Sequence, residues 1–187
     1  FRVMQKQSEV NSSLTPNRET YTTVFDAFIG GGGAELAMAK QSLESGDGAS
    51  FVHRAQVAKL REIYAQGVEH GVYEDLSVVL STREAESESC TINMNQLSRT
   101  EATVATLVLL ERMSTLSGDQ VPSAMFIYAG KVKPGKNGAQ RRLLAIETVL
   151  RAANVKFEIG EVGSAELIAV KGKHCRAWIE KNAGTFV

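Results

Sequence analysis

The sequence predicts an α/β (α+β) protein in which helices cover a small mixed sheet. Short segments rich in β-branched residues alternate with longer segments of helical periodicity, which is typical of this class. Hydrophobic residues make up 43% of the 187 residues and charged residues 22%, as in ordinary globular chains. No apolar run approaches the length of about 20 residues that a membrane span requires, so no membrane partner is expected.

A flexible N-terminal arm, a strand, a glycine-rich turn and a helix are predicted first. Residues 1–20 are polar and have no sustained period, which is typical of an arm. Residues 21–29 are rich in β-branched and aromatic side chains and predict a strand, although a helix that ends at the following glycines fits the same residues. Residues 34–43 are good helix formers.

Two helices and two short strands are predicted in the middle of the chain. Apolar side chains recur at helical spacing in residues 51–69, whereas 76–80 and 90–94 predict strands. Ser98 and Glu101 form a capping box, in which serine accepts from the amide three residues later and glutamate accepts from the serine amide. The helix that starts there is apolar on nearly all sides to about residue 116, so we expect it to be central and buried.

The C-terminal part predicts a β-α-β-β-α unit. Its strands are expected at residues 124–129, 156–159 and 166–170, and its helices at 139–153 and 173–182. A run of this kind forms a compact sheet that helices cover.

The turn-forming sequence SGDQVP, residues 117–122, predicts a boundary. It separates an N-terminal α/β subdomain, residues 21–118, from a C-terminal basic subdomain, residues 119–187, and the arm 1–20 precedes both. One continuous domain fits the same sequence.

The formal charge of zero is an average over unequal segments. Residues 1–61 carry a net charge of +1, residues 62–130 carry −7, and residues 131–187 carry +6. Such an asymmetry concerns partners rather than fold. The basic segment would face an anionic partner or the acidic segment of a second copy in a homo-oligomer; alternatively, the two segments share one surface and cancel.

The strongest candidate binding feature is the loop GKVKPGKNGAQRR, residues 130–142. No acidic residue occurs between Asp119 and Glu147, and the Pro-Gly and Asn-Gly pairs predict tight turns with exposed amides. Amides at a helix N-terminus, together with cations, suit a phosphate or a carboxylate. A solvated loop whose arginines pair with nearby glutamates is the alternative. The anion-binding cations predicted in this loop are Lys131, Lys133, Lys136, Arg141 and Arg142.

These features predict a non-enzymatic binding or assembly factor, such as an accessory protein of a viral or nucleic-acid complex. Its partner would be an RNA or DNA backbone, or an acidic protein surface, contacted through residues 131–142. Base stacking has thin support near the loop, because Tyr128 precedes it and Phe157 and Trp178 are elsewhere in the sequence. The supporting cations are Lys171, Lys173, Arg176 and Lys181.

The competing hypothesis is an enzyme that holds a nucleotide or AdoMet at four consecutive glycines. The segment FDAFIGGGGAELA, residues 25–37, resembles the glycine-rich loop of AdoMet-dependent DNA methyltransferases. The resemblance implies cofactor binding by Gly30, Gly31, Gly32 and Gly33. The sequence has no N-P-P or D-P-P motif and no G-K-[ST] after the glycines, so it predicts no catalytic residue and no P-loop. A hinge or turn is the alternative, and no cofactor is predicted.

The cysteines and histidines predict no metal site and no disulfide. Cys90 and Cys175 are far apart with no C-x-x-C spacing, and the three histidines form no ligand pattern. Two thiols in a reducing, cytoplasmic compartment are the expectation.

Overall fold

The computed structural model describes residues 15–29, 51–81, 89–132, 135, 137–162 and 165–182. The first part of the predicted arm, the four glycines and the predicted helix 34–43 lie outside the described residues, and so do Lys133 and Lys136 of the basic loop.

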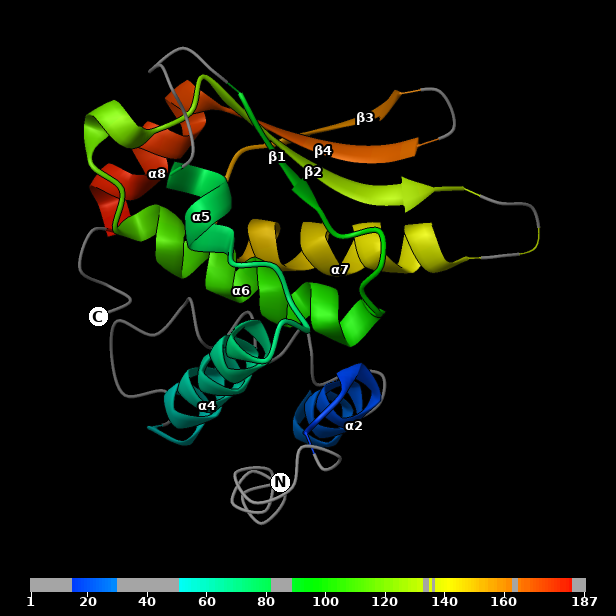
Figure 1. The fold of residues 1–187 in the computed structure, drawn as a ribbon. Helices are drawn as coiled ribbons and strands as arrows, with labels where there is room; N and C mark the ends of the chain where they lie inside the picture. The colour runs from blue at the N-terminus through cyan, green and yellow to red at the C-terminus, as the bar shows by residue number, and fades with distance from the viewer. Residues whose placement is uncertain are drawn as a thin grey trace.

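Helices and a mixed sheet make up the described chain, which confirms the predicted α/β class (Figure 1). The strand order is β1-β2-β4-β3, in which β1 is parallel to β2 and the other two pairs are antiparallel. The elements are α2 (Arg18–Ile29), α4 (Phe51–Glu69), α5 (Leu76–Ser81), β1 (Cys90–Asn93), α6 (Arg99–Ser114), η2 (Gly118–Gln120), β2 (Ala124–Lys131), α7 (Gly138–Ala152), β3 (Glu158–Val162), β4 (Ala165–Lys171) and α8 (Gly172–Asn182).

The core lies on one face of the sheet. Alternate residues of each strand point to opposite faces, and the residues on one face are buried. In Figure 1 the helices α6 and α7 run side by side below this face, and α2 and α4 lie beyond α6. The core-facing strand residues include Ile92, Met125, Ile127, Ile168 and Val170.

The predicted central helix is confirmed as α6. Its capping box is complete, because the amide of Glu101 donates to Ser98 Oγ at 3.2 Å and the amide of Ser98 donates to Glu101 Oε2 at 2.5 Å. Every residue of this helix from Glu101 to Leu110 is buried, since the helices α2, α4, α5, α7 and α8 all pack against it. Packing from all sides explains why the helix is apolar all round.

Residues 21–29 form a helix, so the predicted strand is wrong. Tyr21, Phe25 and Ile29 are buried at i, i+4 and i+8, a spacing that suits one helical face. The β-branched residues are accommodated because the Thr22 and Thr23 hydroxyls donate to backbone carbonyls one turn earlier. Packing of the aromatic face therefore overrides β-propensity. The helix starts within the predicted arm.

Residues 76–80 are also helical and not a strand. The Asp75 carboxylate accepts from the amide of Ser77 at 2.9 Å, which is an N-capping contact. Leu76 and Leu80 are buried at i and i+4 on one side of the short helix α5, which packs against β1 and α6. A five-residue segment has too few positions to distinguish helical from strand periodicity.

The C-terminal β-α-β-β-α unit is confirmed, with one strand displaced by two residues. β3 starts at Glu158 instead of residue 156, because the chain first leaves α7 through Asn154, whose φ is +57°. The amide of Val155 then donates to the carbonyl of Leu150. The residues just before Glu158 therefore end helix α7 and do not join the strand.

β1 precedes the proposed boundary at residues 117–122 and β2 follows it, yet the two strands pair in one sheet. Part of the boundary sequence forms the short 3-10 helix η2. The division into two subdomains stays a prediction.

Candidate functional site

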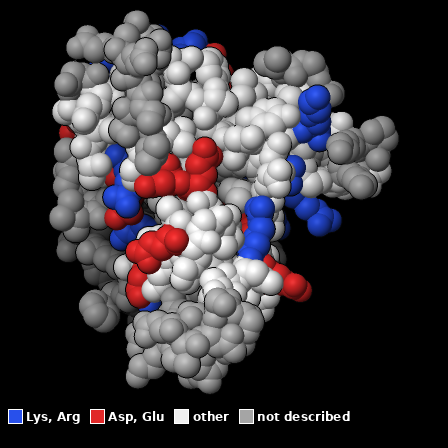
Figure 2. Space-filling model, in the orientation of Figure 1, with Lys and Arg blue, Asp and Glu red and all other residues white. Residues whose placement is uncertain are grey.

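The predicted basic loop lies where β2 ends and α7 begins. Lys131 and Arg141 are exposed there, and Gly130 and Gly135 have φ values of +115° and +71°. The conformation of Gly135 agrees with the tight turn expected at the Pro-Gly pair, whereas Gly130 lies in β2 where the pairing with β4 shifts register and Gly138 begins α7. In Figure 2 basic side chains gather at this end of the molecule, whereas acidic side chains gather over α4 and α5.

Arg142 is engaged by the protein itself. Its Nε donates to the carbonyl of Ala129 at 2.6 Å and its Nη1 donates to the carbonyl of Leu97 at 3.1 Å. Burial lowers the pKa of Arg142, and the nearby Glu166 carboxylate partly offsets that effect. The guanidinium therefore ties the end of β2 to the loop before α6, which is a structural role.

Replacement of Arg142 by leucine is expected to reduce the free energy of unfolding by about 2 kcal/mol, because two partly buried carbonyls lose a charged donor. Arg141→Leu removes the same charge from an exposed position and is expected to change stability by less than about 0.5 kcal/mol. Urea unfolding of both variants measures the difference. Equal losses would contradict the structural role of Arg142.

The structure separates the loop cations from the supporting cations. In the antiparallel pairing of β2 with β4, Lys131 is opposite Ala165, while Lys171 is opposite Ala124. Lys131 and Lys171 consequently lie at opposite ends of the sheet, roughly 20 Å apart at about 3.3 Å per residue. The α8 cations follow Lys171 and belong to the far end (Figure 1).

The exposed face of α8 is set by its anchoring on the other side. Trp178 is buried and its Nε1 donates to the carbonyl of Ala153 at 2.8 Å, and Cys175 is buried one turn earlier. Helical spacing then leaves Lys173, Arg176 and Lys181 exposed. Three of the predicted site residues thus share the solvent side of one helix.

A groove of about 960 Å³ lies between the end of α7, the start of β3 and α8. We call it the basic groove, because most of the titratable groups that line it are basic. Only Lys181 of its charged and aromatic side chains was a candidate from the sequence, and the other five come from α7, the α7–β3 turn, the start of β3 and α8. The charged and aromatic lining residues are Arg151, Lys156, Phe157, Glu158, His174 and Lys181.

The acidic member of the basic groove is already neutralised. Glu158 pairs with Lys171 at 2.5 Å, and this hydrogen bond and charge lower the pKa of Glu158, with smaller contributions from His174 and Lys173. By contrast, Lys156 and Lys181 form no ion pair with any acid in the described part of the chain. The groove therefore presents unbalanced positive charge.

An aromatic ring and a guanidinium lie together at the wall of the basic groove. The Arg151 guanidinium lies 5.3 Å from the centroid of the Phe157 ring, a cation–π arrangement. Arg151 also pairs with Glu147 at 2.7 Å, one turn earlier on α7. These contacts hold Arg151 at the groove, and the ion pair reduces its net contribution of charge.

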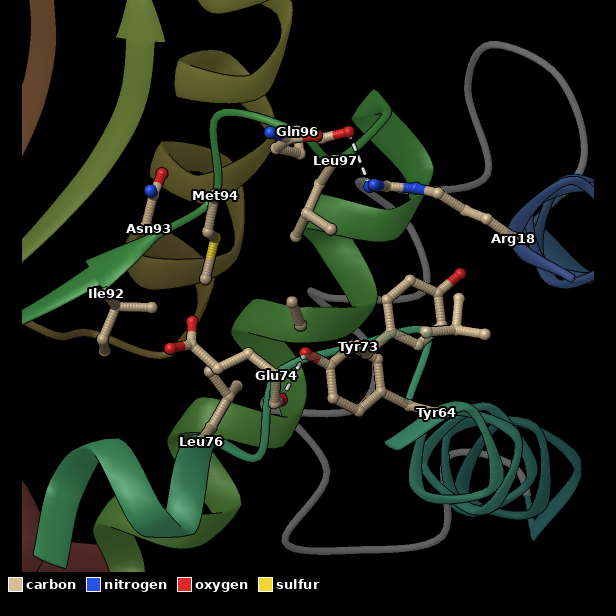
Figure 3. Close-up of a pocket in the computed structure, with 12 residues that line it drawn as sticks. Arg18, Tyr64, Tyr73, Glu74, Leu76, Ile92, Asn93, Met94, Gln96 and Leu97 are labelled. Atoms are coloured by element: carbon tan, nitrogen blue, oxygen red, sulfur yellow. Dashed lines mark hydrogen bonds between the residues drawn. The ribbon is translucent and has the colours of Figure 1, made fainter. Parts of the chain in front are cut away.

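A smaller cavity of about 350 Å³ lies beside the end of β1 (Figure 3). Arg18 reaches from α2 and donates to the carbonyl of Gln96, and Tyr64 donates to the carbonyl of Glu74 at 3.3 Å. Tyr64 and Tyr73 are stacked with centroids 4.8 Å apart. The two hydrogen bonds tie α2 to the loop between β1 and α6, and α4 to the segment that precedes α5.

The structure describes only some of the residues named in the remaining site predictions. Gly30–Gly33 lie outside the described residues, so cofactor binding there stays a prediction. Cys90 and Cys175 are buried and form no disulfide. Among the described residues, no cluster of histidine, cysteine and carboxylate side chains suits a metal ion. The described helices include none with the length and apolarity to cross a membrane.

Comparison of the chain with models of protein families, with curated proteins and with solved structures finds no match.

Proposed function

We propose that this protein is a non-enzymatic binding or assembly factor that contacts a nucleic-acid backbone. The observation that supports the proposal most is the basic groove, in which Lys156 and Lys181 face solvent and the acid Glu158 is already paired. Exposed cations of α8 extend the same positive surface. Lysine and arginine bind phosphates chiefly by releasing the counterions that surround a nucleic acid.

The basic loop would be a second contact. Lys131 and Arg141 are exposed at the opposite end of the sheet. A nucleic-acid strand long enough to reach both ends would therefore contact two separate groups of cations. An acidic protein surface is the other partner that the charge suits. A nucleic acid is the favoured partner, because the groove also has the Phe157 ring at its wall and aromatic rings stack on bases and not on carboxylates.

Charge reversal in the groove tests this proposal. Lys156→Glu and Lys181→Glu are each expected to weaken binding of labelled RNA and DNA and to reduce the magnitude of the log–log salt slope by about 1. Lys59→Glu on α4 makes the same change in net charge outside the groove and is the control. Fluorescence anisotropy at increasing salt concentrations measures both quantities.

The proposal fails if binding is independent of salt, or if the groove variants behave like Lys59→Glu. Binding of polyglutamate without binding of nucleic acid would favour an acidic protein partner instead. Lys131→Glu and Arg141→Glu, measured in the same way, determine whether the loop contributes: a loss of affinity in these variants supports two contacts.

A further inference from the structure

One face of the sheet has no described helix packed against it. The described helices contact the opposite, core-facing side, as Figure 1 shows. Side chains on this open face are half-buried or exposed and do not belong to the hydrophobic core or to the residues packed around it. The central residues of the open face are Thr91, Asn93, Phe126, Tyr128, Leu167 and Ala169.

Two aromatic side chains stand next to each other in the middle of the open face. Phe126 and Tyr128 are at i and i+2 of β2, so their side chains point the same way and are about 6.6 Å apart along the strand. β2 is an inner strand with β1 on one side and β4 on the other. Phe126 is opposite Thr91 and Ala169, which are small, and its side chain is half-buried.

We propose that the open face stacks the bases of a single-stranded nucleic acid, with Phe126 and Tyr128 as the stacking side chains. This inference rests on the proposed function and deepens it, because it names the form of nucleic acid. Unpaired bases stack on aromatic rings that a sheet displays side by side, whereas paired bases in a duplex are not available to them.

Charge at one end of the open face favours this occupant. Register places the exposed Lys131 at one end of the face, whereas Lys171 at the other end is matched by Glu158, which lies beside Ala169. Lys171 pairs with Glu158, which also lines the basic groove. The open face and the groove therefore meet at this ion pair, and one strand of nucleic acid can lie on both.

The borders of the face suit nucleotides better than an apolar protein surface. Thr91 and Asn93 are exposed on β1 beside the two rings and offer hydrogen-bonding groups to base edges. On the other side, Gly160 of β3 has open space where a side chain would stand. The two rings therefore have a polar border on the β1 side and open space at Gly160 on the β3 side.

Leucine substitutions test the stacking directly. Phe126→Leu and Tyr128→Leu keep an apolar side chain in the strand but remove the ring, and each is expected to weaken binding of single-stranded oligo-U and oligo-dT by about 5- to 150-fold. Affinity for a duplex of equal length and the salt slope should stay unchanged, because the cations are untouched. Phe28→Leu, on the partly exposed α2 side chain, is the control.

The outcomes separate this inference from the proposed function. If the wild-type protein binds no nucleic acid, the proposed function fails and the inference fails with it. If it binds with a salt dependence that the groove variants reduce, but both leucine variants bind single strands as the wild type does, only the stacking is overturned. A wild-type dimer that Phe126→Leu or Tyr128→Leu converts to a monomer, by light scattering, would also overturn it, since a second copy would then occupy the face.

Discussion

Replacement of Glu101 by leucine is expected to lower the free energy of unfolding by about 3 to 5 kcal/mol, the range found when one partner of a buried, hydrogen-bonded charge is removed. Glu101 is 1% exposed and lies at the start of α6. Its Oε1 accepts from the hydroxyls of Tyr73 and Thr22, each at 2.8 Å, and its two oxygens accept from Arg18 at 3.2 and 3.3 Å. The leucine variant leaves the Tyr73 hydroxyl without this acceptor, while Thr22 and Arg18 keep only their contacts with the backbone carbonyls of Arg18 and Gln96.

Glu62→Leu is the matched control, because Glu62 is an exposed carboxylate on α4 whose partner, Lys59, is on the same helix. Exposed pairs of this kind contribute less than about 1 kcal/mol. Urea unfolding at pH 7 compares the two variants. A loss for Glu101→Leu no larger than that for Glu62→Leu would contradict the role assigned to the buried carboxylate.

The same carboxylate predicts how stability depends on pH. Burial alone would raise the pKa of Glu101, but hydrogen bonds from Ser98, Arg18, Tyr73 and Thr22 outweigh burial and lower the pKa. A lowered pKa in the folded state stabilises the protein above the unfolded-state pKa of about 4.3, and this contribution is lost as the pH falls through the folded-state value. The stability difference between wild type and Glu101→Leu should therefore shrink on acidification below about pH 4. A difference that stays constant to pH 2.5 would contradict this linkage.

Gly172→Ala is expected to destabilise the protein by about 3 kcal/mol, at the upper end of what overpacking costs. A Cβ atom at residue 172 would overlap the carbonyl oxygen of Pro122 and lie 2.9 Å from that of Ser123. Both obstacles are backbone atoms, which cannot rotate away. The amide of Gly172 also donates to the carbonyl of Ser123 at 2.8 Å, so any shift would break that contact between α8 and the segment before β2.

Gly160→Ala provides the control, because a Cβ atom there meets open space. This change should be neutral or stabilise the protein by about 0.5 kcal/mol, since alanine loses less conformational entropy on folding. Thermal unfolding of both variants makes the comparison. Equal melting temperatures for the two variants would mean that the backbone around Pro122 yields more easily than the structure implies.

Elements with a strong local signal were predictable from the sequence. The capping box placed the start of α6, and long helical periodicity placed α4 at residues 51–69. The segments that failed, 21–29 and 76–80, are short and rich in β-branched residues. The helical form of 21–29 depends on burial of Tyr21 and Phe25 against distant parts of the chain, and that of 76–80 on burial of Leu76 and Leu80, which no local pattern records.

The candidate site was less predictable, because it depends on strand register. The cations of the basic loop and of α8 belong to the same basic segment of the sequence. Antiparallel pairing of β2 with β4 nevertheless places the two groups at opposite ends of the sheet. Arg141 and Arg142 are neighbours in the sequence, yet only Arg142 donates to buried carbonyls. Phe126 and Tyr128 became candidates only once one face of the sheet was known to have no described helix against it.

The outer strands of the sheet have a consequence for self-association into fibrils. β1 and β3 form its two edges and are only four and five residues long. Edge strands present unpaired backbone amides and carbonyls, and short edges limit how many of these can pair with another chain. Gly160 and the exposed carboxylate of Glu158 on β3 further disfavour pairing with a flat apolar strand. Concentrated protein should consequently resist edge-to-edge growth of β-aggregates.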